Sequence, residues 1–194
     1  EAIRGAANAV LLSNCGDEVF FRGIVEFSNV CASDCHYCGI RAGNREVERY
    51  TLTEDEIVDA ALWCAGRGYG SIVLQSGERQ DENFVDLVER TVTRIKRDSV
   101  SETLPRGLGI TLSVGEQTHD VYERWFRAGA HRYLLRIETT APHLFAQIHP
   151  PRQTLENRIR CLYTLRDTGY QVGTGMMVGE HMEAWKFKDE RPED

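Results

Sequence analysis

The chain has 194 residues, of which 41% are hydrophobic and 27% charged, and its formal net charge is -7. This balance is typical of one soluble globular domain, and the acidic total argues against nucleic acid as a partner. No apolar run is long enough to cross a bilayer and no signal peptide is recognised, so we expect a cytoplasmic protein without membrane contact.

The predicted elements alternate between strand and helix along residues 19–179. Runs of β-branched and aromatic residues predict strands over residues 19–29, 71–75, 108–113, 132–138 and 170–178. Apolar residues repeat at helical spacing over residues 57–65, 84–95, 121–128 and 155–165. Residues 1–18 are interpreted as a leader or the remnant of a helix, and residues 180–194 as a polar tail that is non-native or disordered.

The strand–helix order predicts an α/β fold with parallel strands and right-handed crossovers. A doubly wound sheet and a (β/α) barrel both fit this order. Polar residues follow several strands at their carboxyl ends, where barrel enzymes build their sites. We therefore expect a partial (β/α) barrel of the TIM type with about five parallel strands.

Three of the six cysteines lie within eight residues as Cys31, Cys35 and Cys38, in the pattern C-x3-C-x2-C. A tight cluster in a long chain without a secretion signal indicates metal binding in a reducing compartment. Three thiolates can hold a [4Fe–4S] cluster and leave its fourth iron without a protein ligand. A zinc site that includes His36, or buried structural cysteines, are the alternatives.

With Tyr37 as the aromatic residue before the third cysteine, the motif resembles the signature of the radical S-adenosylmethionine (SAM) superfamily. The resemblance implies a [4Fe–4S] cluster on Cys31, Cys35 and Cys38 whose open iron binds SAM. It also implies reductive cleavage of SAM to a 5′-deoxyadenosyl radical, in a barrel of the radical SAM type. No catalytic residue is expected beyond the cluster and the SAM site.

Residues 74–78 (LQSGE) and 133–139 (YLLRIET) are similar to the branch that matures [FeFe]-hydrogenase, the HydE type, within the biotin synthase-like group. The resemblance runs from about residue 22 to residue 179 and implies a role in assembling the H-cluster. It implies a small-molecule or small organometallic substrate, an external electron donor such as ferredoxin or flavodoxin, and other hydrogenase maturation proteins as partners. Another biotin synthase-like enzyme, such as a methylornithine synthase-like one, and a non-catalytic Fe–S or zinc-binding module are the alternatives.

The resemblance further implies a set of residues around SAM. In the family, the matching positions contact the SAM amino group, line the SAM pocket with polar groups, or carry charges near SAM. The residues at these positions are Tyr37, Gln75, Ser76, Gly77, Glu78, Thr111, Arg136, Glu138 and Arg158. Arg158 matches an arginine near the SAM carboxylate. A structural ion pair between Glu138 and Arg158, and a simple strand-to-helix turn at residues 75–78, are the alternatives.

Several other residues are expected to be structural. Cys64 and Cys161 fall on or near apolar helix faces and are expected in the core. The four histidines without paired metal spacing are expected on the surface or in loops: His119, His131, His143 and His149. After Gly179 the sequence departs from the family pattern, which continues with further strand–helix units. We therefore expect this chain alone to keep the cluster loop but to be weakly active or inactive.

Overall fold

The computed structural model describes residues 1–178. Its five strands form one parallel sheet in the order β1-β2-β3-β4-β5. The strands are β1 (Gly23–Ser28), β2 (Ser71–Ser76), β3 (Gly109–Ser113), β4 (Arg132–Leu134) and β5 (Gln171–Gly173). A doubly wound sheet reverses its strand order at a switch point, whereas a (β/α) barrel adds each strand beside the last. The sequential order therefore confirms the predicted α/β fold as part of a barrel.

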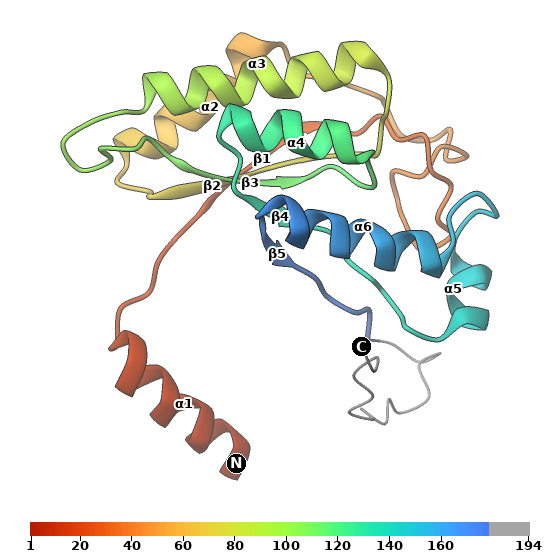
Figure 1. Cartoon of the computed structure of the whole chain (residues 1–194), viewed down its shortest axis with the longest axis horizontal. Helices are drawn as coiled ribbons and strands as arrows, with labels where there is room; N and C mark the ends of the chain where they lie inside the picture. Colours follow the sequence, from red (N-terminus) through yellow and green to blue (C-terminus); the bar gives the residue numbers. More distant parts are fainter. Residues whose placement is uncertain (179–194) are drawn as a thin grey trace.

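The helices are α1 (Ala2–Cys15), α2 (Glu54–Gly66), α3 (Glu82–Asp98), α4 (His119–Ala128), α5 (Pro142–Ile148) and α6 (Leu155–Thr168). Figure 1 shows α2, α3, α4 and α6 along one side of the sheet, and no helix of residues 1–178 covers the other side. Helix α1 lies apart from the sheet, and none of its residues is buried. The interpretation of residues 180–194 lies outside the described residues.

The crossover helices begin at side chains that cap them. A capping box is present at Thr53 and Glu56, because the Thr53 hydroxyl accepts from the Glu56 backbone while the Glu56 carboxylate accepts from the Thr53 N–H. Asp81, Thr118 and Thr154 cap α3, α4 and α6 in the same position. Each cap satisfies backbone N–H groups that lack a partner within the helix.

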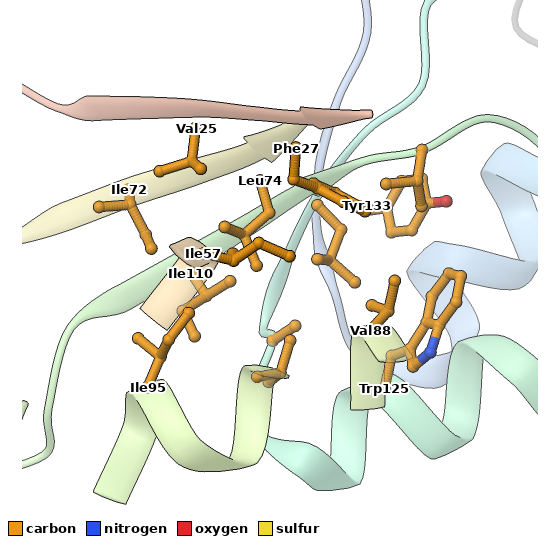
Figure 2. Close-up of a cluster of buried hydrophobic side chains, with 14 of the residues drawn as sticks. Val25, Phe27, Ile57, Ile72, Leu74, Val88, Ile95, Ile110, Trp125 and Tyr133 are labelled. Atoms are coloured by element: carbon orange, nitrogen blue, oxygen red, sulfur yellow. The ribbon is translucent and has the colours of Figure 1, made fainter. Parts of the chain in front are cut away.

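The core lies between the sheet and these helices. Figure 2 shows strand side chains, among them Val25, Phe27 and Leu74, packed against helix side chains such as Trp125. The Trp125 indole also donates to the Val85 carbonyl over 3.1 Å, so this large side chain buries no unpaired donor. Cys64 and Cys161 are both buried at 6% exposure, as the sequence predicts for core residues.

The opposite face of the sheet is more polar. Glu26 pairs in register with Gln75, and Gln75 with Ser113, so these side chains alternate with the core residues and share the uncovered face. Thr111 belongs to the same face, because it pairs with Val73 two residues before Gln75. In a (β/α) barrel this is the inner face.

Three observations differ from the sequence expectation. Strands β4 and β5 are shorter than predicted, since beyond them only an isolated bridge joins Glu138 to Met176. The short helix α5 was not predicted. His149 directly follows α5 and is buried at 2% exposure, so the expectation of a loop residue holds but that of a surface residue is wrong. No helix among residues 1–178 is long and apolar enough to span a membrane.

Candidate active site

The cysteine motif lies in the connection from β1 to α2, directly after the carboxyl end of β1 (Figure 1, orange, at right). Cys31, Cys35 and Cys38 are each partly buried, and all three are free thiols. The motif therefore lies at the end of the sheet where (β/α) barrels place their reactive groups.

Arg49 fixes the shape of this connection. Its guanidinium donates to four backbone carbonyls at 2.6 to 2.9 Å, those of Asn29, Ile40, Arg41 and Asn44. A guanidinium carries five N–H donors in a rigid fork, so most of its capacity is used here. The connection thus has a defined path without regular secondary structure. Sequence reasoning missed Arg49, because nothing in its neighbourhood marks it among the many arginines.

Cys31 lies against the end of β2. The backbone N–H groups of Ser33 and Glu78 point at its Sγ, at 3.4 and 3.3 Å. Gly77 permits this approach, since a Cβ there would lie 2.4 Å from the Val30 oxygen and 2.7 Å from the Cys31 Cβ. Burial raises the pKa of Cys31, and the two N–H groups lower it. N–H donors around a ligand sulfur are a typical feature of iron–sulfur sites.

The donor set fits an iron–sulfur cluster. It consists of three free thiols on one short connection, with backbone donors already directed at one sulfur. Burial raises the pKa of Cys35 to about 11, so iron has to displace its proton. His36, the alternative zinc ligand, is exposed. Among residues 1–178, no three His, Cys, Asp or Glu side chains gather closely enough to hold a single metal ion.

Glu78 joins the cysteine loop to two other segments. Its Oε1 accepts from the Ser33 hydroxyl at 2.8 Å and from Gln153 Nε2 at 3.1 Å. Its Oε2 accepts from the Glu116 backbone N–H at 2.9 Å and from the same Gln153 nitrogen at 3.2 Å. The Arg152 guanidinium lies 3.9 Å away. The carboxylate is thus surrounded by protein donors and acts as a support for the loop, while its predicted contact with SAM stays a prediction.

The segment between α5 and α6 completes this support. Gln153 also accepts from the Cys35 thiol at 3.3 Å, and Arg152 donates to the Ser33 hydroxyl at 2.8 Å. Neither residue was predicted as part of the site. They lie more than 110 residues from the cysteines in the chain, so only the fold could show the contact.

Tyr37 is held by a histidine from the same segment. Its hydroxyl forms a hydrogen bond with His149 Nε2 at 3.1 Å, and His149 Nδ1 lies 3.0 Å from the Phe145 carbonyl. The rings of Phe145 and His149 are stacked with centroids 3.8 Å apart. Burial lowers the pKa of His149, which favours the neutral ring. This arrangement anchors the aromatic residue of the motif between two cysteines.

Arg158 forms a buried ion pair, but its partner is not the one that the sequence suggested. The guanidinium binds the Glu116 carboxylate at 2.5 Å and the Arg136 carbonyl, whereas Glu138 was the partner considered from the sequence. Asn157 donates to the other oxygen of Glu116. Both charged side chains are less than 10% exposed, which requires such pairing.

Glu138, four residues beyond the end of β4, has an unusual backbone conformation. Its φ is 61°, the left-handed region that non-glycine residues seldom adopt. The backbone N–H donates to the Gly175 carbonyl at 3.1 Å, and the Met177 N–H donates back at 3.0 Å, which holds this conformation. Burial raises the pKa of Glu138, while Arg136 and Arg158 lower it. Such strain is often found at functional positions, in agreement with the predicted role of Glu138.

The remaining predicted residues lie along β2 and β3. Gln75 donates to Glu26 at 3.1 Å across the two strands, and the Ser76 hydroxyl donates to the Gly77 carbonyl at 2.8 Å. The Thr111 hydroxyl is buried and has no partner among the described residues. The structure therefore brings Gly77 and Glu78 to the cysteines, whereas Gln75 and Thr111 face the inner side of the sheet.

A family profile for the radical SAM superfamily matches residues 25–189, and the chain belongs to this superfamily. The [FeFe] hydrogenase maturase subunit HydE of Thermotoga maritima is 43% identical over 180 residues, which are 92% of this chain and 49% of that protein. A 3-methylornithine synthase of Methanosarcina barkeri is 28% identical over 184 residues, again 92% of this chain and 49% of the relative. The chain spans about half the length of these curated relatives.

Solved structures show the same fold. HydG, a maturase of the [FeFe]-hydrogenase, superposes with a TM-score of 0.78 at 19% identity, covering 89% of this chain and 38% of HydG. Methylornithine synthase (PylB) gives a TM-score of 0.74 at 25% identity, covering 89% of this chain and 49% of the synthase. These similarities confirm the partial radical SAM barrel, and the HydE relative confirms the resemblance to that branch.

Proposed function

We propose that this chain is part of a radical SAM enzyme that acts in assembly of the [FeFe]-hydrogenase H-cluster. The observation that carries the proposal is the set of three free, partly buried thiols at the carboxyl end of β1, with two N–H groups directed at Cys31. The 43% identity to the HydE maturase supports the branch. The family implies a [4Fe–4S] cluster and SAM, and Cys31, Cys35 and Cys38 would hold the cluster.

When bound, the cluster would supply the electron that cleaves SAM to a 5′-deoxyadenosyl radical. The protein groups around it hold the loop in place: Glu78 joins three segments, and His149 fixes Tyr37. The charges of Arg136 and Arg158 lower the pKa of the Glu138 carboxyl group. Opposite charges of this kind suit the amino, carboxylate and sulfonium groups of SAM.

The proposed substrate is a small molecule or a small organometallic precursor, which would lie against the inner face of the sheet near Gln75 and Thr111. The polar character of this face supports the placement, because Glu26, Gln75 and Thr111 alternate with the core residues along three neighbouring strands. The proposed partners are an electron donor such as ferredoxin or flavodoxin and other hydrogenase maturation proteins.

A second candidate is an enzyme that acts on an amino acid, as methylornithine synthase does. The sequence and structural similarity to 3-methylornithine synthases favours it as the alternative. Substrate trials with the full-length enzyme separate the two, since both would release 5′-deoxyadenosine but only with their own substrates.

Oxygen-free reconstitution with iron and sulfide tests the proposal. We expect about four irons per chain, the number in one [4Fe–4S] cluster, and a visible spectrum that changes when SAM is added. The Cys35→Ser variant should lose the cluster. The matched control is Cys15→Ser, because Cys15 is exposed on α1 outside the loop. A parent chain that takes up no iron, or equal iron in Cys35→Ser and the parent, would contradict the proposed ligands.

A further inference from the structure

A basic hollow lies at the end of the sheet opposite the cysteine loop. It has a volume of about 620 Å³ and is formed by the turns that precede β2, β3, β4 and β5. In Figure 1 this end of the sheet is at left, where the connection from α3 to β3 swings outward. The six residues of β2 separate it from the candidate active site by roughly 17 Å.

Among residues 1–178, three cationic side chains line the hollow, Lys96, Arg106 and Arg132, together with the imidazole of His131, and no Asp or Glu does. A second hollow of about 420 Å³ shares Gly70 and Arg132 with it and adds two more cationic side chains, Arg22 and Arg67, again with no carboxylate from the described residues. None of these six side chains forms an ion pair within residues 1–178. This is unexpected in a chain with a net charge of -7.

Hydrogen bonds hold two of these cations in place. Lys96 Nζ donates to the Leu108 carbonyl at 2.8 Å, and Arg132 Nε donates to the Gln171 side chain at 2.8 Å. Gly129 lies so close to the Lys96 stem that a Cβ there would be 2.7 Å from Lys96 Cγ. The fold thus holds Lys96 in one position, at the edge of the hollow.

The cations also repel one another. After burial, the nearby charge of Arg106 lowers the pKa of Lys96, and Lys96 and Arg106 both lower the pKa of His131. Like charges held together without counter-charges destabilise the folded chain, and a bound anion would offset that repulsion.

We propose that this hollow binds a small polyanion that carries several phosphate groups. Its volume is that of a small-molecule site, and guanidinium and ammonium groups are the usual ligands of phosphate oxygens. A nucleic acid is disfavoured, because the chain as a whole carries a net charge of -7. The proposal is independent of the proposed function.

Titration calorimetry of the 194-residue chain with tripolyphosphate tests the proposal. We expect saturable binding that weakens with added salt, and an affinity about tenfold lower in Arg106→Gln and in Arg132→Gln, since a hydrogen bond to a charged group is lost. The matched control is Arg127→Gln, which removes the same charge from an exposed site on α4 and should bind like the parent. Circular dichroism confirms that each variant is folded.

Two outcomes would overturn the proposal. The first is an absence of saturable binding, or a loss in Arg127→Gln equal to that in Arg106→Gln, which would mean that only the overall charge matters. The second concerns the class of ligand. If an oligoglutamate peptide binds more tightly than tripolyphosphate and loses affinity in the same two variants, the hollow is a docking surface for an acidic protein instead.

Discussion

Replacing Glu78 with glutamine tests whether its carboxylate supports the cysteine loop. Glutamine has nearly the same shape, but one of the two oxygens becomes an NH2 group. Both oxygens of Glu78 accept from Gln153, and each accepts from one further donor, Ser33 or Glu116. In either orientation of the new amide, its NH2 group therefore faces hydrogen-bond donors, the Ser33 hydroxyl and Gln153 on one side or the Glu116 N–H and Gln153 on the other.

The expected cost follows from these contacts. Hydrogen bonds to a charged group contribute about 1.5–3 kcal/mol each, and with the new NH2 group on the Ser33 side the change removes two such contacts at one oxygen, those from Ser33 and Gln153. Allowing for relaxation of Ser33, whose hydroxyl can rotate, we expect the free energy of unfolding to fall by about 3 kcal/mol. In a chain of this size that corresponds to a decrease in Tm of roughly 6–12 °C.

Urea and thermal unfolding followed by circular dichroism measure this change. Glu26→Gln is the matched control, because Glu26 is exposed on the neighbouring strand and its carboxylate accepts from no side chain but Gln75 among residues 1–178. We expect it to lie within about 0.5 kcal/mol of the parent. If Glu78→Gln lies within the same range, the carboxylate does not stabilise the fold and the assignment of its role is wrong.

Three further changes have defined outcomes. Arg49→Lys should lower the free energy of unfolding by about 2 kcal/mol and reduce iron uptake, since an ammonium cannot reach four carbonyls, whereas Arg45→Lys in the same loop should change neither. Glu138→Gly should be about 1 kcal/mol more stable than Glu138→Ala, because only glycine adopts a φ of 61° without strain; equal unfolding curves would contradict this. Burial lowers the pKa of His149 below its unfolded value near 6.5, so the unfolded chain binds the proton more readily and stability should fall as pH drops below about 6.5. His149→Gln should remove that part of the pH dependence, and an unchanged slope in urea unfolding between pH 7 and 5.5 would refute it.

The fold could be predicted largely from local patterns. The capping box at Thr53 and the apolar spacing of α3 mark helices within the sequence itself, and both are present. Periodicity could not choose between a barrel and a doubly wound sheet, because both use the same strand–helix order. The sequential pairing of β1 to β5 distinguishes them. Which strands pair depends on residues far apart in the chain, so a short stretch of sequence does not indicate it.

Element ends were harder to predict. The apolar run after Arg132 continues past Leu134, but the regular ladder stops there, and beyond it only the isolated bridge between Glu138 and Met176 remains. Helix α5 has only seven residues and no cap from a side chain, so it lacks the repeats from which a helix is recognised.

The candidate site was predicted in part. The spacing of the cysteines identifies the loop from adjacent residues alone. The partners of Glu78 could not be found in this way, because Ser33, Glu116 and Gln153 lie 45, 38 and 75 residues from it. Glu116 was not among the predicted site residues, and the ion pair that it forms with Arg158 depends on the packing of α6.

Because the helices pack on one side of the sheet, the two faces of each strand tolerate different amino-acid substitutions. Alternate residues of each strand have different surroundings. Val25, Leu74 and Leu112 pack against the helices, whereas Glu26 and Thr111 lie on the opposite face of the sheet. Substitutions at the second set leave the hydrophobic contacts intact. A new ligand preference can therefore arise by exchanging every other residue of a strand, and the scaffold that carries the cysteine loop is kept.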